Sequence, residues 1–270
     1  MQSNFRKLNK VILLTNSNSI KGRSMLKSIQ DSNMEIEKVI AINTNYHYYL
    51  KLFNFVSKRV GVFQALIFSI LKVFSDQIHE LFFCDLKSLS SLLKEYKLSS
   101  INIKGNKDWQ KLANQAIDAC DSRVIIIGQV GILGKEFNLK RNDRIILNSH
   151  PGMLPKFRGL DSFKWAMLEK DWEGLKTTIH IVRDKIDGGE IIQINSYNWR
   201  KLNWFFVDRQ LLIISGNHLV RFLSNLKAEN ILEDILNQSI TQKEEFTLYN
   251  KMKISKEIKS LSTYLLNKYF

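Results

Sequence analysis

Asn148 and His150, two polar side chains with complementary chemistry, stand close together in the segment NSHPGMLP. An asparagine amide can donate to a carbonyl oxygen, and an imidazole can gain or lose a proton near neutral pH. Because side chains alternate in an extended segment, both should lie on the same side of the chain. The chain's two prolines, Pro151 and Pro155, follow directly. We expect them to stiffen this loop, since proline fixes its own φ angle.

A carboxylate at Asp187, in the glycine-rich turn IDGGEI, completes the set. Eight of the twelve glycines lie between residues 128 and 189, so tight turns and close backbone approaches are concentrated there. An amide donor, an imidazole and a carboxylate suit polarisation of a carbonyl and proton transfer without a covalent intermediate. Ser149 lacks the G-x-S-x-G setting of a serine nucleophile. The histidines lack the spacing of a metal site, so we expect no metal.

The elements that must position these residues alternate between strand and helix, which is typical of a parallel sheet covered by helices. We expect strands at 10–15, 37–43, 80–85, 100–105, 123–129, 143–148, 177–182 and 190–197, and helices around 25–29, 85–98, 108–119 and 203–228. Asn148 ends one of the central strands, where ligands bind in open α/β sheets. The sequence therefore predicts a Rossmann-like, mostly parallel α/β sheet flanked by helices.

We expect the chain to divide into a catalytic domain, residues 1–200, and a helical C-terminal extension, residues 201–270. Residues 46–78 break the strand–helix rhythm and are long, aromatic and apolar, which predicts a helical insertion. Its most apolar part, 60–74, is shorter than the roughly 20 residues that a membrane span needs. A buried or partner-facing helix is the preferred interpretation, and a helix lying on a membrane surface is the alternative.

The net charge of +14 is compatible either with an anionic partner or with compositional bias, because the basic residues are spread along the whole chain. Cys84 and Cys120 offer no disulfide framework, and we expect both to be small buried residues in a reducing compartment. The apolar run near the N-terminus is too short for a signal peptide. These features favour a cytoplasmic protein.

Three stretches, VIIIGQVGILGKEF, RIILNSHPGMLPKFRGLDSFKWAM and TTIHIVRDKIDGGEIIQ, resemble the folate-dependent N-formyltransferases. That family includes enzymes that act on glycinamide ribonucleotide, on methionyl-tRNA and on sugar nucleotides. Its signature is N-x-H-P-x-x-L-P, followed about forty residues later by an acid in an Ile/Leu-Asp-x-Gly turn. Here Asn148 and Asp187 are 39 residues apart, and the match covers roughly residues 123–197.

The resemblance implies a formyltransferase fold with 10-formyltetrahydrofolate as co-substrate and without a metal. It implies that Asn148 donates its amide to the formyl oxygen as that oxygen becomes an oxyanion. His150, as imidazolium, would support the same oxyanion or protonate the leaving nitrogen. Asp187 would hold His150 charged and, through a water, collect the proton of the attacking amine. His180 lies in mid-strand, and we interpret it as structural, with an orienting role as the alternative.

The resemblance also assigns binding residues. The folate-lining segment is Gln129, Val130, Gly131, Ile132 and Leu133, and the loop closing over it is Arg183, Asp184, Lys185 and Ile186. Candidates for contact with the second substrate are Asn16, Ser17, Asn18, Lys156 and Arg158. The two basic residues among them also fit ordinary solvated charges. Many family members carry serine at the position of Gly152, so glycine here predicts either a more flexible loop or room for a bulkier acceptor.

The acceptor amine is less constrained. The segment TNSNSIKGR lacks the glycines that would let backbone amides hold the phosphate of glycinamide ribonucleotide. About 70 residues follow position 200, which is short for the C-terminal barrel of the methionyl-tRNA enzymes. An amino sugar on a nucleotide, as used in surface polysaccharide biosynthesis, is therefore the preferred acceptor. Three alternative functions stay open: formylation of glycinamide ribonucleotide, formylation of methionyl-tRNA, and a binding role for an inactive homologue. A homodimer also stays open. Apart from the methionyl-tRNA alternative, no nucleic acid partner is expected.

Overall fold

The computed structural model describes the central part of the chain. It covers residues 9–241 except 33, 44–52, 54–56, 58–60, 65, 68, 71–76, 79–85, 142, 160–161, 204–205 and 227–230, and it also covers 248–249. The predicted strand at 80–85 therefore lies outside the described residues, and so does Cys84. Cys120 is buried, as predicted.

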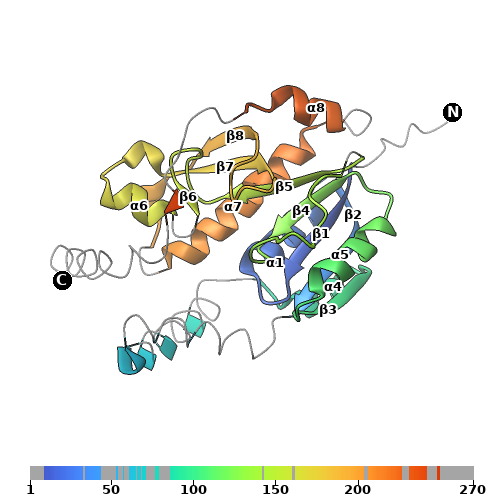
Figure 1. Ribbon diagram of the computed structural model, residues 1–270, viewed down its shortest axis with the longest axis horizontal. Coiled ribbons are helices and arrows are strands. Elements are labelled where there is room, and N and C mark those ends of the chain that lie inside the picture. The colour runs from blue at the N-terminus through green and yellow to red at the C-terminus, as the bar shows by residue number, and fades with distance from the viewer. Residues whose placement is uncertain are drawn as a thin grey trace.

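A seven-stranded sheet forms the centre of the molecule, in the order β3-β2-β1-β4-β5-β7-β8 (Figure 1). Its strands are β1 (Asn9–Asn16), β2 (Met34–Asn43), β3 (Ser100–Lys104), β4 (Val124–Gly128), β5 (Ile145–His150), β7 (Lys176–Ile181) and β8 (Ile191–Ser196). The first five pair in parallel, whereas β7 and β8 are antiparallel to their neighbours. The predicted mostly parallel α/β sheet is confirmed.

Helices cover both faces of the sheet, as the burial of every residue of β4 requires. One face of the sheet packs with α1 (Ile20–Gln30), α4 (Leu89–Glu95), α7 (Val207–Ser224) and α8 (Ile231–Gln238). The other face packs with α5 (Trp109–Asp118) and with apolar residues of the loop after β4. A smaller cluster joins α6 (Ser162–Leu168) to the start of α7. The short strands β6 (Arg158–Gly159) and β9 (Leu248–Tyr249) pair beside it.

Helix α7 realises most of the predicted helix at 203–228, α8 lies within the extension predicted to be helical, and α6 has no predicted counterpart. Both are short, at 7 and 8 residues, and so carry little periodic signal. Helix α7 lies against α1, where Ser24 Oγ donates to Asn217 Oδ1 at 2.6 Å. The division of the chain at residue 200 stays a prediction.

The insertion at 46–78 is described only in part. Its described residues from 62 to 70 are helical, and Val62, Phe63, Leu66, Ile67 and Ile70 are all exposed. These five side chains are therefore not buried within this chain, which leaves the partner-facing and membrane-surface interpretations. Among the residues that the structure describes, no helix is both long and apolar enough to cross a membrane.

Candidate active site

Asn148 lies in β5, opposite His180 of β7 in the antiparallel pair. Its Nδ2 lies 3.2 Å from His180 Nε2, and its Oδ1 accepts a hydrogen bond of 2.9 Å from Lys21 Nζ. A lysine ammonium can only donate, so this contact fixes which end of the Asn148 amide is oxygen. The –NH2 end therefore faces His180, with a second N–H left for another acceptor.

His180 is buried and accepts from Asn148. Its Nδ1 lies 3.0 Å from the backbone oxygen of Ile181 and must donate to it, because a carbonyl can only accept. Burial lowers the pKa of His180 to about 4, although Asp187 opposes that change. His180 is therefore neutral at physiological pH, with Nε2 unprotonated. Its contact with Asn148 places it in the candidate site, as an orienting role requires.

His150 and Asp187 meet in the same place, although they are far apart in the chain. His150 Nδ1 lies 3.5 Å from Asp187 Oδ2, and Nε2 lies 2.8 Å from the oxygen of Phe157. Both nitrogens of this buried ring thus face acceptors, an arrangement that suits an imidazolium. His180 Nε2 is 3.7 Å from the other Asp187 oxygen. Asp187 therefore folds back beside His150, and Asn148 and His150 lie on the same side of β5.

The carboxylate of Asp187 is held in its ionised form. Burial alone would raise its pKa, but His150, His180, the Gly159 amide and Lys21 together lower it. The Gly159 amide donates to Oδ2 at 3.0 Å. Asp187 itself has a φ of 48°, a left-handed backbone conformation that is uncommon for a residue other than glycine. The turn after β7 thus holds the carboxylate in one orientation toward the histidines.

Lys21 is not among the site residues predicted from the sequence. It lies in the first turn of α1 and is 3% exposed. Burial lowers the pKa of its amine to about 7, against the raising effect of Asp187. Nothing in its local sequence distinguishes it from a solvated lysine, except the glycine that follows it.

The proline loop is fastened from β7. Thr178 Oγ1 donates to the Gly152 oxygen at 2.8 Å and accepts from the Leu154 amide at 2.9 Å. A side chain at Gly152 would meet Ser162, since its Cβ would lie 2.4 Å from Ser162 Oγ. The prediction that Gly152 leaves room for a bulkier acceptor is therefore wrong. The hydroxyl of Ser162 fills that space and donates to the Pro151 oxygen at 2.8 Å.

The two proposed folate-binding segments present apolar surface beside polar backbone. Gln129 and Gly131 have φ values of 72° and 87°, so the chain turns sharply as it leaves β4. Ile132 in the first segment is 70% exposed, and Ile186 in the second is 42% exposed. Flat heterocycles with a hydrogen-bonding edge suit such a setting, and the residues present thus fit the pterin of 10-formyltetrahydrofolate. In the second segment, Arg183 pairs with Glu190 at 2.9 Å.

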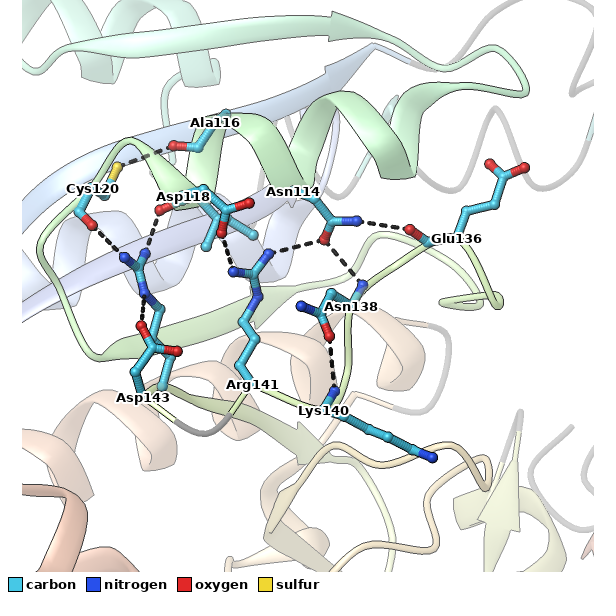
Figure 2. Close-up of polar contacts among 11 residues, drawn as sticks. Asn114, Ala116, Asp118, Cys120, Glu136, Asn138, Lys140, Arg141 and Asp143 are labelled. Carbon is cyan, nitrogen blue, oxygen red and sulfur yellow. Dashed lines mark hydrogen bonds and ion pairs between the residues drawn. The ribbon is translucent and has the colours of Figure 1, made fainter.

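The loop that continues the first segment is held by one face of α5. Gln110 accepts from the Gly134 amide and donates to the Ile132 oxygen. Asn114, one turn later, donates to the Glu136 oxygen at 2.7 Å and accepts from the Asn138 amide at 3.1 Å (Figure 2). Arg141 closes the loop onto Asp118 and Asn114. Residues four apart on α5 thus fix successive parts of the loop.

The candidates for the second substrate divide into two groups. Asn16 ends β1, Ser17 and Asn18 follow it, and the Asn16 amide donates to the oxygen of Gln129, in the proposed folate segment, at 3.2 Å. Arg158 is buried, and burial lowers its pKa against the raising effect of Asp187, with which it interacts electrostatically. Lys156 instead pairs with Asp171 at 2.7 Å. The structure therefore brings Arg158 to the site and directs Lys156 elsewhere.

A cavity lies away from these residues. A polar cavity of about 470 Å³ opens between β8, α7 and α8, lined by residues that include Asn195, His218 and Arg221. None of its lining residues belongs to the cluster around Asn148. Among the described residues, no group of three or more histidine, cysteine, aspartate or glutamate side chains could hold a metal ion.

Known proteins resemble this chain over part of its length. The family model described as formyl transferase matches residues 90–198. The phosphoribosylglycinamide formyltransferase of Haemophilus influenzae is 36% identical over 69 residues, which cover 26% of this chain and 32% of that protein. The enzyme of the same name from Escherichia coli is 39% identical over 69 residues, with the same coverage. The chain thus spans about a third of the length of these curated relatives.

Solved structures share the fold over a longer range. Glycinamide ribonucleotide transformylase 1 from Symbiobacterium toebii superposes with a TM-score of 0.52 at 14% identity, covering 83% of this chain and 89% of that one. Phosphoribosylglycinamide formyltransferase from Brucella melitensis gives 0.52 at 17% identity, covering 82% and 97%. Similarity at this level of identity establishes the fold alone. The segment 90–198, which matches the formyl transferase family model, holds Asn148, His150, His180 and Asp187.

Proposed function

We propose that the protein is an N-formyltransferase that moves a formyl group from 10-formyltetrahydrofolate to a primary amine. The observation that carries the proposal is the cluster of Asn148, His150, His180 and Asp187 within the segment that matches the formyl transferase family. When bound, 10-formyltetrahydrofolate would supply an activated formyl carbon for attack by the amine. Gln129–Leu133 and Arg183–Ile186 would hold it.

Asn148 is the donor toward the formyl oxygen. One Nδ2–H is used by His180, and the second is oriented by the same amide plane. A donor that is already in place stabilises negative charge on oxygen without reorganisation, which is a large source of rate enhancement. Because Asn148 is held from both ends, little of that enhancement is lost to side-chain rotation.

His150 and Asp187 handle the protons. Asp187, ionised and 3.5 Å from His150 Nδ1, stabilises the imidazolium. As one C–N bond forms and the other breaks, Asp187 takes up the amine proton through a water, and His150 protonates the departing nitrogen. The exchange leaves no net proton on the site.

The loop after β1 supports an acceptor other than glycinamide ribonucleotide. The backbone amides of residues 16–19 all donate within the protein, namely to Gln129 O, Ile42 O, Asn16 Oδ1 and Asn16 O. Amides that are already bonded cannot cradle a phosphate as a glycine-rich loop does. We therefore propose an amino sugar carried on a nucleotide, with a role in surface polysaccharide biosynthesis in the cytoplasm.

Glycinamide ribonucleotide is the second candidate, because the relatives that match over 69 residues are named phosphoribosylglycinamide formyltransferases. That match includes less than a third of this chain, so it does not include all the residues that we propose to contact the acceptor.

An acceptor panel tests the proposal. The purified protein is incubated with 10-formyltetrahydrofolate and nucleotide-linked amino sugars, glycinamide ribonucleotide or methionyl-tRNA, and the products are identified by mass spectrometry. We expect a formylated amino sugar in amounts equal to the tetrahydrofolate released. Formylation of the ribonucleotide alone would replace the preferred acceptor with the second candidate. Release of no tetrahydrofolate with any amine would contradict the enzymatic function.

A further inference from the structure

Lys21 is a buried lysine that contacts the proposed oxyanion donor but has no part in the proposed chemistry. Its Nζ donates to Asn148 Oδ1 at 2.9 Å and to the backbone oxygen of Ser149 at 2.7 Å. Buried lysines are rare unless they are paired or functional. Both of these contacts are to neutral oxygens, so the amine is held in place at the cost of desolvation.

Two glycines allow the lysine to reach this position. At Gly22, a Cβ would lie 1.9 Å from Thr15 Oγ1, so the start of α1 is pressed against the end of β1. At Gly216 of α7, a Cβ would lie 3.3 Å from Lys21 Cγ. Helix α7 therefore passes directly over the lysine stem and separates it from water. The close approach of α1, β1 and α7 thus buries a lysine, a residue type that usually lies at the surface.

The contacts form a hydrogen-bond chain whose direction is fixed at both ends. Lys21 can only donate, which makes the facing atom of Asn148 its oxygen and turns the –NH2 toward His180. At the far end the Ile181 carbonyl can only accept, which leaves His180 Nε2 as an acceptor for Asn148. Each end requires the same orientation of the amide, so the two constraints reinforce each other.

We propose that Lys21 is a positioning residue for formyl transfer, which fixes the Asn148 amide with its –NH2 edge toward the formyl oxygen. This inference rests on the proposed function. Without Lys21, Asn148 Oδ1 loses its donor, and the reversed amide would place an acceptor where the oxyanion needs a donor. The charged and titratable groups that act on Lys21 in this setting are Asp187, from the turn after β7, and His180, on β7.

The test compares Lys21→Met, Lys21→Arg and the matched control Lys27→Met, an exposed lysine of the same helix. Steady-state kcat and KM are measured for both substrates, with Asn148→Ala as reference. For Lys21→Met we expect kcat to fall about 10- to 100-fold, as for a misplaced catalytic group, while each KM changes less than about three-fold. Lys21→Arg, which retains a donor, should recover part of kcat, and Lys27→Met should match the unchanged protein.

Each other outcome has a definite meaning. An unchanged kcat in Lys21→Met, in a protein where Asn148→Ala is inactive, overturns the role of Lys21 alone. If Lys21→Met does not fold, Lys21→Gln takes its place. A loss of kcat, substrate affinity and urea midpoint together in both variants would show that Lys21 has a structural role only. If the unchanged protein transfers no formyl group, the proposed function fails and this inference fails with it.

Discussion

Asn148, His150 and His180 stand on two hydrogen-bonded strands, whereas the loop from Gly131 to Arg141 is held by side chains of one helix, α5. The strand pairing sets Asn148 opposite His180 directly, and the surrounding groups are buried. The loop is largely exposed and depends on individual amide side chains. The contrast indicates that rate should depend on the sheet and cofactor affinity on the loop.

Replacing Asn148 with alanine should have the largest effect. Loss of one preorganised donor to an oxyanion lowers kcat by about 100- to 1000-fold. Steady-state kinetics with both substrates checks the value. Asn102→Ala, at an exposed position of β3, is the matched control and should leave kcat unchanged. A loss of kcat below ten-fold for Asn148→Ala would show that Asn148 does not stabilise the oxyanion, and would contradict the view that rate depends on the sheet.

Gly22→Ala compared with Gly134→Ala contrasts the packing of the two regions. The new methyl group at Gly22 meets Thr15 and the backbone of Gly128, so overpacking should lower the free energy of unfolding by about 1–3 kcal/mol. At Gly134 the nearest neighbour is the end of the flexible Gln110 side chain, and the change should be smaller. Urea denaturation measures both, and equal losses would contradict the contrast.

The free energy of unfolding should depend on pH through His180, which lies on the sheet. Folded His180 has a pKa of about 4, against about 6.5 when unfolded. As pH falls from about 6.5 toward 4, the unfolded state binds a proton that the folded state does not. The free energy of unfolding should therefore fall by up to about 1.4 kcal/mol per pH unit. His180→Asn should flatten the curve in this window, and an unchanged slope would show that His180 is not buried as a neutral ring.

Asn114→Ala should have the smallest effect and should act on binding. It removes three hydrogen bonds to the loop, at Glu136, Asn138 and Arg141. At about 0.5–1.5 kcal/mol for a typical hydrogen bond, we expect the KM for 10-formyltetrahydrofolate to rise about 3- to 10-fold with kcat little changed. Gln115→Ala, on an exposed position of the same helix, is the control. A fall in kcat with KM constant would place the loop among the rate-determining parts.

The parts of the molecule that sequence could predict are those with a strong local signal. Continuous apolar runs predicted the central strands, and the resemblance of their motif to the formyltransferases predicted that Asn148, His150 and Asp187 would meet. Lys21 gave no such signal, because its burial follows from the approach of Gly22 and Gly216 across three elements. The orientation of Lys156 toward Asp171 and the space filled by Ser162 beside Gly152 likewise depend on tertiary contacts between distant segments.

Single-turnover transfer tests the central claim most directly. The protein, in excess over 10-formyltetrahydrofolate labelled in the formyl carbon, is mixed with a nucleotide-linked amino sugar, and the label is followed by mass spectrometry. We predict that the label moves to the sugar amine in the unchanged protein, and that transfer is lost in Asn148→Ala and in Asp187→Asn. Transfer that proceeds equally in all three proteins, or label that reaches no amine in any of them, would contradict the account.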